Sequence, residues 1–539
     1  MNAFGALLRL RLRRDAVQLT IWTLGMLLLA YGSAAGVTEN FGTLEERTSL
    51  LSLAVANPVI LLFRGLPSGT DEGSFIVFLV LPFLAMTAAL MASFLAVRHT
   101  RAEEESGRAE QVAATTAGRW MPVAATLVHG ILSSALLGAA AALAFLLSGL
   151  TPAGSLLTGT SIAIVGVVFL SVGLLSAQLF FSARAANSLT VAVLVGTFIV
   201  GGVGNAVGTA DDSLTRMTSS GLAWVSPFVW AENVRPFADD DVRPLLLALG
   251  ASAVLVTVSL ALQAARDVGS GVFAARPARA EATALLSGPA GLVWRLSAGS
   301  LVAWAVGAAV IGLLSTSLAS VVQEVASDNP AVQAILQQLA AEGSMDQGLI
   351  VTFFVMVGVL AACFGVQTVQ RARQEETHGT AEATLGTPVD RAAWLGAFLV
   401  VALVGIAIIV AAAVAAATVA LAVSGGDSSL AADALLVGAG QGIAAMVFTV
   451  ITAIVFTLAP RLTIGLGWAL VLVAACLALF GTIFGLDDDI VALSPFAAVP
   501  VPDGSGIDGN GVGWLVIVAV AGAAASLTLM RRRELAPGG

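Results

Sequence analysis

Twelve long apolar runs divide this chain and leave few folds open to it. Each can cross a bilayer, because a hydrocarbon core of about 30 Å needs roughly 20 helical residues. The runs lie near residues 16–37, 74–97, 121–148, 159–181, 189–208, 245–264, 297–321, 349–369, 393–423, 435–458, 464–484 and 514–530. Hydrophobic residues make up 58% of the 539 positions, whereas soluble domains contain about 45–50%. The sequence therefore predicts an all-α polytopic membrane protein with 12 transmembrane helices.

The connecting segments differ in their Arg content. All 25 basic residues are Arg, and 20 of them fall in the inner segments if the N-terminus is inside. The five in the outer segments are Arg47, Arg64, Arg216, Arg235 and Arg243. Because short Arg-rich loops stay in the cytoplasm, we expect an N-in, C-in protein that crosses the cytoplasmic membrane many times.

The residues before the first run alternate apolar and basic side chains. Arg9, Arg11, Arg13 and Arg14 interleave with Phe4 and several Leu residues. Long Arg stems can reach water while Leu side chains enter the headgroup boundary, which predicts an interfacial lead-in segment. A plain topogenic signal is the alternative.

A charged stretch between apolar runs occurs twice. We call residues 98–119 the first charged loop and residues 370–391 the second charged loop. At an offset of 272 positions they match at Arg101/Arg373, Glu103/Glu375, Glu104/Glu376, Gly107/Gly379, Glu110/Glu382 and Arg119/Arg391. This match indicates an internal duplication.

A second match supports the duplication. Ser226-Pro-Phe228 and Ser494-Pro-Phe496 lie 268 positions apart, each just before the last run of its half. We therefore predict two parallel six-helix repeats, residues 1–283 and 284–539, joined by a cytoplasmic linker at 266–290.

Several kinds of chemistry are excluded or unsupported by the residues present. A Walker A loop needs a Lys on the nucleotide phosphates, and this chain has none, so it contains no P-loop ATPase. Its three His and two Cys are scattered without metal-ligand spacing, and there is no basic patch for nucleic acid. We expect no metal site, no catalytic residues and no cofactor in this chain.

Polar residues inside the apolar runs are few, and no Asp, Glu or Arg lies well inside any run. His129 is the one candidate for a proton relay, and a hydrogen bond to a neighbouring helix is the alternative. Gln18, Asn205, Gln367 and Gln441 could line a substrate cavity or could bond between helices.

The acidic residues of the two charged loops predict a docking surface. Glu104 and Glu110 flank Gly107 at equal spacing, as Glu376 and Glu382 flank Gly379. In a short helix these acids would meet Arg or Lys on a partner, while the Gly would allow close backbone approach. A solvated turn is the alternative for either copy alone.

At these loops the sequence resembles the permease subunits of ABC-2 type exporters, in a tandem form similar to actinobacterial antibiotic and multidrug exporters. The family pattern of the helix that couples to the ATPase fits the second charged loop at Glu375, Gly379, Thr380, Glu382, Thr387, Pro388 and Arg391. The first charged loop departs from it, with Arg108 in place of the Thr and Thr116 in place of the Pro. The resemblance implies ATPase-coupling roles for Glu103, Glu104, Gly107, Glu110, Arg119, Glu375, Glu376, Gly379, Thr380, Glu382, Pro388 and Arg391.

The resemblance implies a permease that pairs with two copies of a separate ABC ATPase, which would bind ATP and Mg. The expected activity is export of apolar or amphipathic small molecules by alternating access. A lipid could also be the substrate. An ion-coupled secondary drug transporter and a membrane enzyme acting on lipid-linked substrates are the alternatives.

Overall fold

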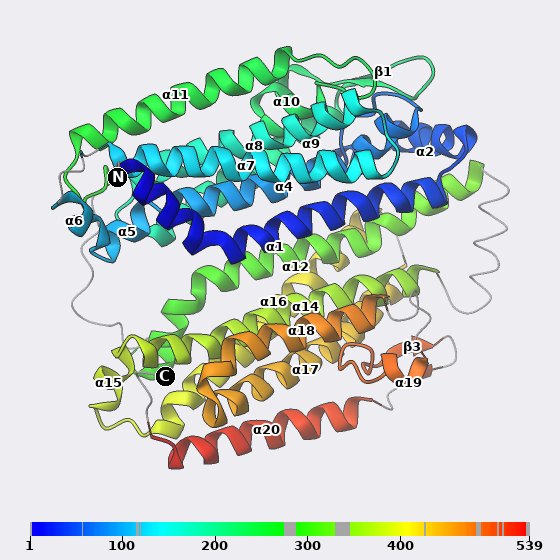
Figure 1. Cartoon of the computed structure of the whole chain (residues 1–539). Coiled ribbons are helices and arrows are strands. Elements are labelled where there is room, and N and C mark those ends of the chain that lie inside the picture. The colour runs from blue at the N-terminus through cyan, green and yellow to red at the C-terminus, as the bar shows by residue number, and fades with distance from the viewer. Residues whose placement is uncertain are drawn as a thin grey trace. The chain divides into compact units, whose positions relative to one another are not determined.

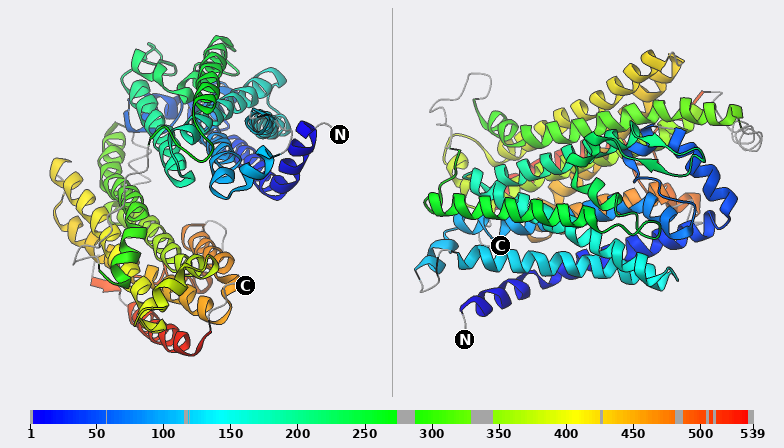
Figure 2. Two further views of the ribbon diagram at one scale, coloured as in Figure 1. Left: turned by 90° about the vertical axis from the view of Figure 1, so that its left-hand side faces the viewer. Right: turned by 90° about the horizontal axis from the view of Figure 1, so that it is seen from above.

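The computed structural model describes residues 3–56, 58–114, 118, 120–273, 287–328, 345–424, 427–480, 487–503, 506–508 and 511–534. The chain forms two compact units, Met1–Ala278 and Arg279–Gly539. In the described parts, 12 helices are long and apolar enough to cross a membrane, and six of them belong to each unit. The predicted all-α polytopic fold with 12 spans is confirmed. Within each unit the long helices run side by side as a bundle (Figure 1), which the left view of Figure 2 shows nearly end-on.

The first unit contains helices, two short strands and one 3-10 turn. In chain order they are α1 (Ala3–Asn40), α2 (Leu44–Ala56), α3 (Pro58–Phe63), α4 (Glu72–Arg98), α5 (Arg101–Glu105), α6 (Arg108–Ala113), α7 (Met121–Leu147), α8 (Pro152–Leu179), α9 (Ala183–Ala206), β1 (Thr209–Ala210), β2 (Met217–Thr218), η1 (Gly221–Val225), α10 (Pro227–Glu232) and α11 (Arg243–Ala265). β1 and β2 pair antiparallel, with Thr209 opposite Thr218.

Helix α4 is the centre of the first unit. It begins at Asp71, whose side chain accepts a hydrogen bond from the Ser74 amide at 3.0 Å, and it buries most of its length. Next to it, α7 and α8 cross at Gly138 and Gly159, where a Cβ on either residue would lie within 2.4 Å of the other's carbonyl oxygen. Only glycine permits this approach, which brings the third and fourth spans into van der Waals contact.

The second unit repeats the order of long helices. Its elements are α12 (Pro289–Asp328), α14 (Met345–Thr377), α15 (Thr380–Leu385), α16 (Arg391–Ser424), α17 (Ser429–Leu458), η4 (Pro460–Leu462), α18 (Thr463–Phe480), α19 (Asp488–Val491), β3 (Val501–Asp503), β4 (Gly506–Asp508) and α20 (Val512–Arg532). β3 and β4 pair antiparallel. α14, α16 and α17 pack together, and Gly405 leaves room for the Phe364 ring between α16 and α14.

The two Ser-Pro-Phe motifs have the same structural role. Phe228 is buried against Phe169 of α8, with ring centroids 5.3 Å apart. Phe496 is buried and stacks on Phe448 of α17, with centroids 4.8 Å apart. In each unit the motif therefore inserts a Phe ring into the core, against the fourth span.

The predicted lead-in segment is part of a longer element. α1 is one helix from Ala3 to Asn40, so the Arg-rich residues continue into the first span without a break in the helix. Figure 1 shows α1 (dark blue) bending near its N-terminal end. The short apolar stretch Pro58–Phe63 forms α3, which at 6 residues is too short to span.

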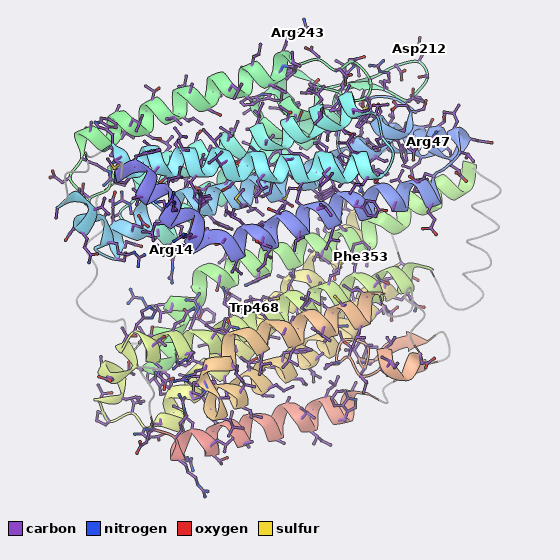
Figure 3. All side chains as sticks on the ribbon, in the orientation of Figure 1. Arg14, Arg47, Asp212, Arg243, Phe353 and Trp468 are labelled. Atoms are coloured by element: carbon purple, nitrogen blue, oxygen red, sulfur yellow. The ribbon has the colours of Figure 1, made fainter. Side chains whose placement is uncertain are left out.

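Charged residues gather at the two ends of the first bundle. Figure 3 places Arg14 toward the end that carries α5 and α6, and Arg47 and Asp212 toward the opposite end. At that opposite end Arg216 pairs with Asp239 at 2.7 Å. The residues that the sequence assigns to inner and outer segments thus lie at opposite ends of this unit.

Candidate functional site

Both charged loops fold into the same local structure. In each, a helix ends, a glycine in the left-handed region follows, and a short helix begins. Gly107, with φ 72°, lies between α5 and α6, and Gly379, with φ 74°, lies between α14 and α15. A Cβ on either glycine would meet nothing within 4 Å. Glycine is required here for the positive φ, which costs other residues free energy, and the close approach of a partner's backbone stays a prediction.

In the first charged loop, the Glu104 carboxylate lies between two Arg side chains. Arg101 donates to it at 2.8 Å, and Arg266, just after α11, donates at 2.6 and 2.9 Å. The Gly269 amide adds a bond at 3.2 Å. Arg101 is itself buried and also bonds to the Ala177 carbonyl at 2.8 Å. The loop is thereby tied to the end of the last span of its unit.

The second charged loop has the same arrangement. Arg373 donates to Glu376 at 2.9 Å, and Arg533, just after α20, donates at 2.6 and 2.8 Å. The Glu376 side chain is 1% exposed. Arg533 also lies over the Phe456 ring, 4.5 Å from its centroid. We call these two groups, Arg101–Glu104–Arg266 and Arg373–Glu376–Arg533, the first and second clamps.

The clamps change the interpretation of two predicted residues. Glu104 and Glu376 were expected to present their charges to a partner, but their carboxylates are paired inside their own units. The sequence did not indicate the contribution of Arg266 and Arg533, which there only add to the excess of Arg in the inner segments. Their shared place directly after the last span of each half was the signal that could have identified them.

Other acids of the charged loops differ in exposure. Glu110 and Glu382 are exposed at the starts of α6 and α15. Glu103 is largely buried and pairs with Arg11 at 3.2 Å, whereas Glu375 accepts a hydrogen bond from the Thr380 hydroxyl at 2.6 Å. Glu110 and its counterpart Glu382 are therefore the matched pair of predicted acids that is exposed in both charged loops.

The end of the second charged loop borders a surface groove. The groove, about 710 Å³ in volume, is lined by Glu382, Leu385, Asp390, Arg391 and Arg531, among others. Arg391 donates to the Arg533 carbonyl, which adds a second tie to the end of α20. The predicted residue Pro388 is exposed in the bend before α16. The predicted residue Arg119, which in the first charged loop corresponds to Arg391, lies outside the described residues.

A smaller hollow lies beneath the first charged loop. It has a volume of about 110 Å³, and its walls include Leu7, Arg11, His99, Glu104 and Arg266. These residues come from α1, the end of α4, the loop and the segment after α11. The first loop therefore covers a space of mixed polarity.

The four residues predicted for a substrate cavity all bond to neighbouring elements. Arg98 donates to Gln18, and the Trp304 indole donates to Gln367 at 3.1 Å. The Gln441 amide donates to the Phe496 carbonyl at 3.0 Å, and the Asn205 amide donates to Glu232 at 2.6 Å. These bonds fit the alternative left open by the sequence, in which such side chains join neighbouring elements. Their role in a substrate cavity stays a prediction.

The partner of Asn205 is an unusual carboxyl group. Glu232 closes α10, outside the spans, and is buried. Burial raises the pKa of Glu232 to about 8, and the hydrogen bond from Asn205 opposes only part of that rise. Glu232 is therefore protonated at neutral pH.

Comparison with known proteins assigns the family. The family described as "Multidrug efflux system permease Rv1217c, C-terminal domain" matches residues 5–262 and 286–531. The multidrug efflux system permease protein Rv1217c of Mycobacterium tuberculosis is 33% identical over 531 residues, which cover 98% of this chain and 94% of that protein. With its 12 apolar helices, the chain is a multi-pass protein of the cell membrane and a transport subunit. It belongs to this family of multidrug efflux permeases and is an exporter permease of the ABC-2 type.

Proposed function

We propose that this permease is driven by ATP hydrolysis on a separate partner and exports apolar or amphipathic small molecules. Two copies of an ABC ATPase subunit, which hold ATP and Mg, would bind at the two charged loops. Movement of the loops would switch a path through the permease between inward and outward access. Both termini and both loops would then face the cytoplasm.

The repeated clamp is the observation that carries this proposal. In each unit one carboxylate just before the loop glycine, Glu104 in α5 or Glu376 at the end of α14, pairs with an Arg that follows the last span. Removing one partner of a buried ion pair costs about 3–5 kcal/mol, so the start of each charged loop and the end of the last span should move together. A push on the loop would thus be transmitted to a membrane helix.

The exposed acids supply the contact with the partner. Glu110 and Glu382 occupy matching positions on α6 and α15, and Glu382 also lines the groove that contains Asp390 and Arg391. Complementary charges at such a surface set the orientation and the rate of association. The first loop departs from the family pattern at Arg108 and Thr116, so we expect the two contacts to differ in strength.

The residues of this chain favour an energy source that lies on another protein. It has no Lys for a Walker A loop. Apart from Asp15 in α1, the charged residues of its described spans lie near the helix ends, as with Arg295 in α12 and Asp433 in α17. A middle without fixed charge suits an uncharged or amphipathic cargo better than an ion.

Reconstitution tests this proposal. The permease is co-expressed with an ABC ATPase subunit from the same genome, and the pair is placed in proteoliposomes. We expect no ATPase activity from the permease alone, and drug uptake into inside-out vesicles with ATP and without an ion gradient. Gradient-driven uptake by the permease alone, abolished by His129→Ala, would instead identify an ion-coupled transporter.

A further inference from the structure

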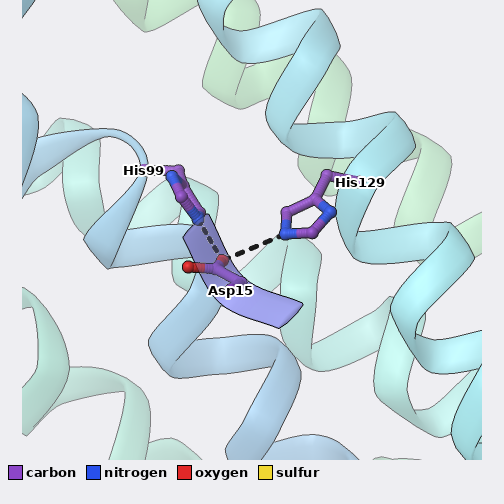
Figure 4. A group of neighbouring side chains, drawn as sticks. All are labelled: Asp15, His99 and His129. Atoms are coloured by element: carbon purple, nitrogen blue, oxygen red, sulfur yellow. Dashed lines mark hydrogen bonds and ion pairs between the residues drawn. The ribbon is translucent and has the colours of Figure 1, made fainter. Parts of the chain in front are cut away.

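Three ionisable side chains meet inside the first unit. Asp15 of α1, His99 at the end of α4 and His129 of α7 are all buried. The Nε2 atoms of His99 and His129 lie 2.5 and 3.1 Å from the same carboxylate oxygen, Oδ2 of Asp15 (Figure 4). Residues from three separate spans therefore turn their metal-binding atoms toward one point.

The donor set matches that of a transition-metal site. One ligand atom from each side chain can be chosen so that all three lie within 4.8 Å of one another. Two imidazole nitrogens and one carboxylate oxygen are a common set for Zn²⁺ with a further position open. Bonds of about 2.0–2.1 Å in tetrahedral geometry place ligand atoms roughly 3.3 Å apart. The Asp15–His129 separation of 3.1 Å is close to this, and the Asp15–His99 separation of 2.5 Å would lengthen by about 0.8 Å.

The Nδ1 atoms of His99 and His129 are also placed as expected for a metal bound at Nε2. Neither Nδ1 has a hydrogen-bond partner, and Nδ1 of His99 faces Oε1 of Glu103 at 3.6 Å. If Nε2 carried the only proton, a ring lone pair would face this carboxylate. A metal on Nε2 places the proton on Nδ1, which can then point toward Glu103, as in many carboxylate–histidine–metal groups. Arg98 holds the other oxygen of Asp15 at 3.2 Å.

The corresponding positions of the second unit hold other residues. Aligning Arg13 with Arg295 and Trp22 with Trp304 places Ser297 opposite Asp15, and the loop offset of 272 places Arg371 opposite His99 and Val401 opposite His129. There, Arg371 bonds to the Leu296 carbonyl and to the Ser300 hydroxyl at 3.4 Å. The repeat therefore does not require an Asp–His–His group for packing.

Two hollows border the group. His99 forms part of the wall of the hollow beneath the first charged loop. Asp15 lines a smaller hollow of about 10 Å³ on its other side, together with Gln18 and Arg98.

We propose that Asp15, His99 and His129 bind one transition-metal ion of the Zn²⁺ class. The ion joins α1, α4 and α7 at the base of the first charged loop. Imidazole ligands favour Zn²⁺, Co²⁺, Ni²⁺ or Cu²⁺ over Mg²⁺ and Ca²⁺, which prefer oxygen. The first loop would thus be held by a metal as well as by its clamp, and the second loop by its clamp alone.

Metal titration of the full-length protein tests this site. After treatment with a chelator, the purified permease is titrated with Zn²⁺ against a chromogenic competitor, with Mg²⁺ in excess. We expect one Zn²⁺ per chain in the wild type. His99→Gln, His129→Gln and Asp15→Asn should abolish this binding, whereas Glu103→Gln should weaken it about 10–100-fold, as expected for an outer partner. His378→Gln is the matched control, because His378 is the remaining His and is exposed in the second charged loop.

Two measurements keep the test decisive if a variant misfolds. Zn²⁺ should raise the thermal midpoint of the wild type, since a ligand that binds only the folded state stabilises it. X-ray absorption of the Zn²⁺-loaded wild type should show two imidazole ligands. Zn²⁺ binding that survives all three ligand substitutions would overturn the proposal. So would a chelator-treated wild type that binds no Zn²⁺.

Discussion

Arg533 donates two hydrogen bonds to Glu376, a residue 157 positions earlier in the chain, at 2.6 and 2.8 Å. Arg266 makes the equivalent contact with Glu104, 162 positions earlier, at 2.6 and 2.9 Å. Both Arg residues directly follow the last span of their unit. The acidic cluster that is most conspicuous in the sequence therefore serves first to join distant parts of each unit.

Neutralising the central acid of a clamp should destabilise the permease. Glu376→Gln leaves Arg373 and Arg533 buried together without a counter-charge, which is expected to cost about 3–5 kcal/mol. Glu104→Gln should have a similar effect through Arg101 and Arg266. Glu382→Gln, at an exposed position, should change stability by about 0–1 kcal/mol. Thermal unfolding of the purified permease measures all three, and equal effects of Glu376→Gln and Glu382→Gln would contradict the clamp.

Reversing the exposed acids should weaken binding of the ATPase without unfolding the permease. If Glu110 and Glu382 meet buried basic residues of the partner, each reversal to Arg should cost about 2–5 kcal/mol of binding. Glu382→Arg should do more harm, because the second loop keeps the family pattern. ATPase retained on the tagged permease is the measurement, and Asp212→Arg is the control. Retention at the wild-type level after both reversals would show that these acids are only solvated.

The two loop glycines should resist substitution. Gly107→Ala or Gly379→Ala places a Cβ on a residue with positive φ, at a cost of about 1–2 kcal/mol. Asn should be tolerated better, because it visits this region more readily. Gly250→Ala in the middle of α11, where a Cβ meets nothing within 4 Å, should instead stabilise by about 0.5–1 kcal/mol. Denaturation midpoints of the three variants decide whether the glycines are needed for the turn.

Stability should fall as the pH rises from weakly acidic to weakly basic. The pKa of Glu232 is about 8 in the folded protein, above the 4.5 that is ordinary for a Glu side chain, so the folded state holds this proton more tightly. Its contribution is fully present below pH about 4.5 and is lost as pH approaches 8, by about 1.4 kcal/mol per pH unit. Glu232→Gln should remove this slope. The thermal midpoint measured across this pH range tests it, and an unchanged slope in the variant would assign the effect to another group.

Accessibility to an impermeant thiol reagent should reveal the orientation. In a background without Cys363 and Cys476, Cys at positions 106, 182 and 378 should be protected in intact cells. Cys at positions 212 and 488 should react. The reason is the excess of Arg in the segments assigned to the cytoplasm. Labelling of position 378 from outside would reverse the second unit and exclude parallel repeats.

The sequence by itself determined the membrane class, the 12 spans and the positions of the two charged loops. These properties depend on the length of apolar runs and on local matches between the two halves, both of which can be seen along one chain. The shared turn at Gly107 and Gly379 is also local, although its reason, a positive φ, became visible only in the backbone.

Only the tertiary structure decided which side chains meet. The inward direction of Glu104 and Glu376 depends on where the ends of α11 and α20 lie, and those ends are more than 150 positions away in the chain. The meeting of Asp15, His99 and His129 likewise depends on the rotation of three helices about their axes. Helix rotation is set by the packing of small residues such as Gly138 and Gly159 across helix contacts, and apolar periodicity alone does not specify it when most faces of a membrane helix are apolar.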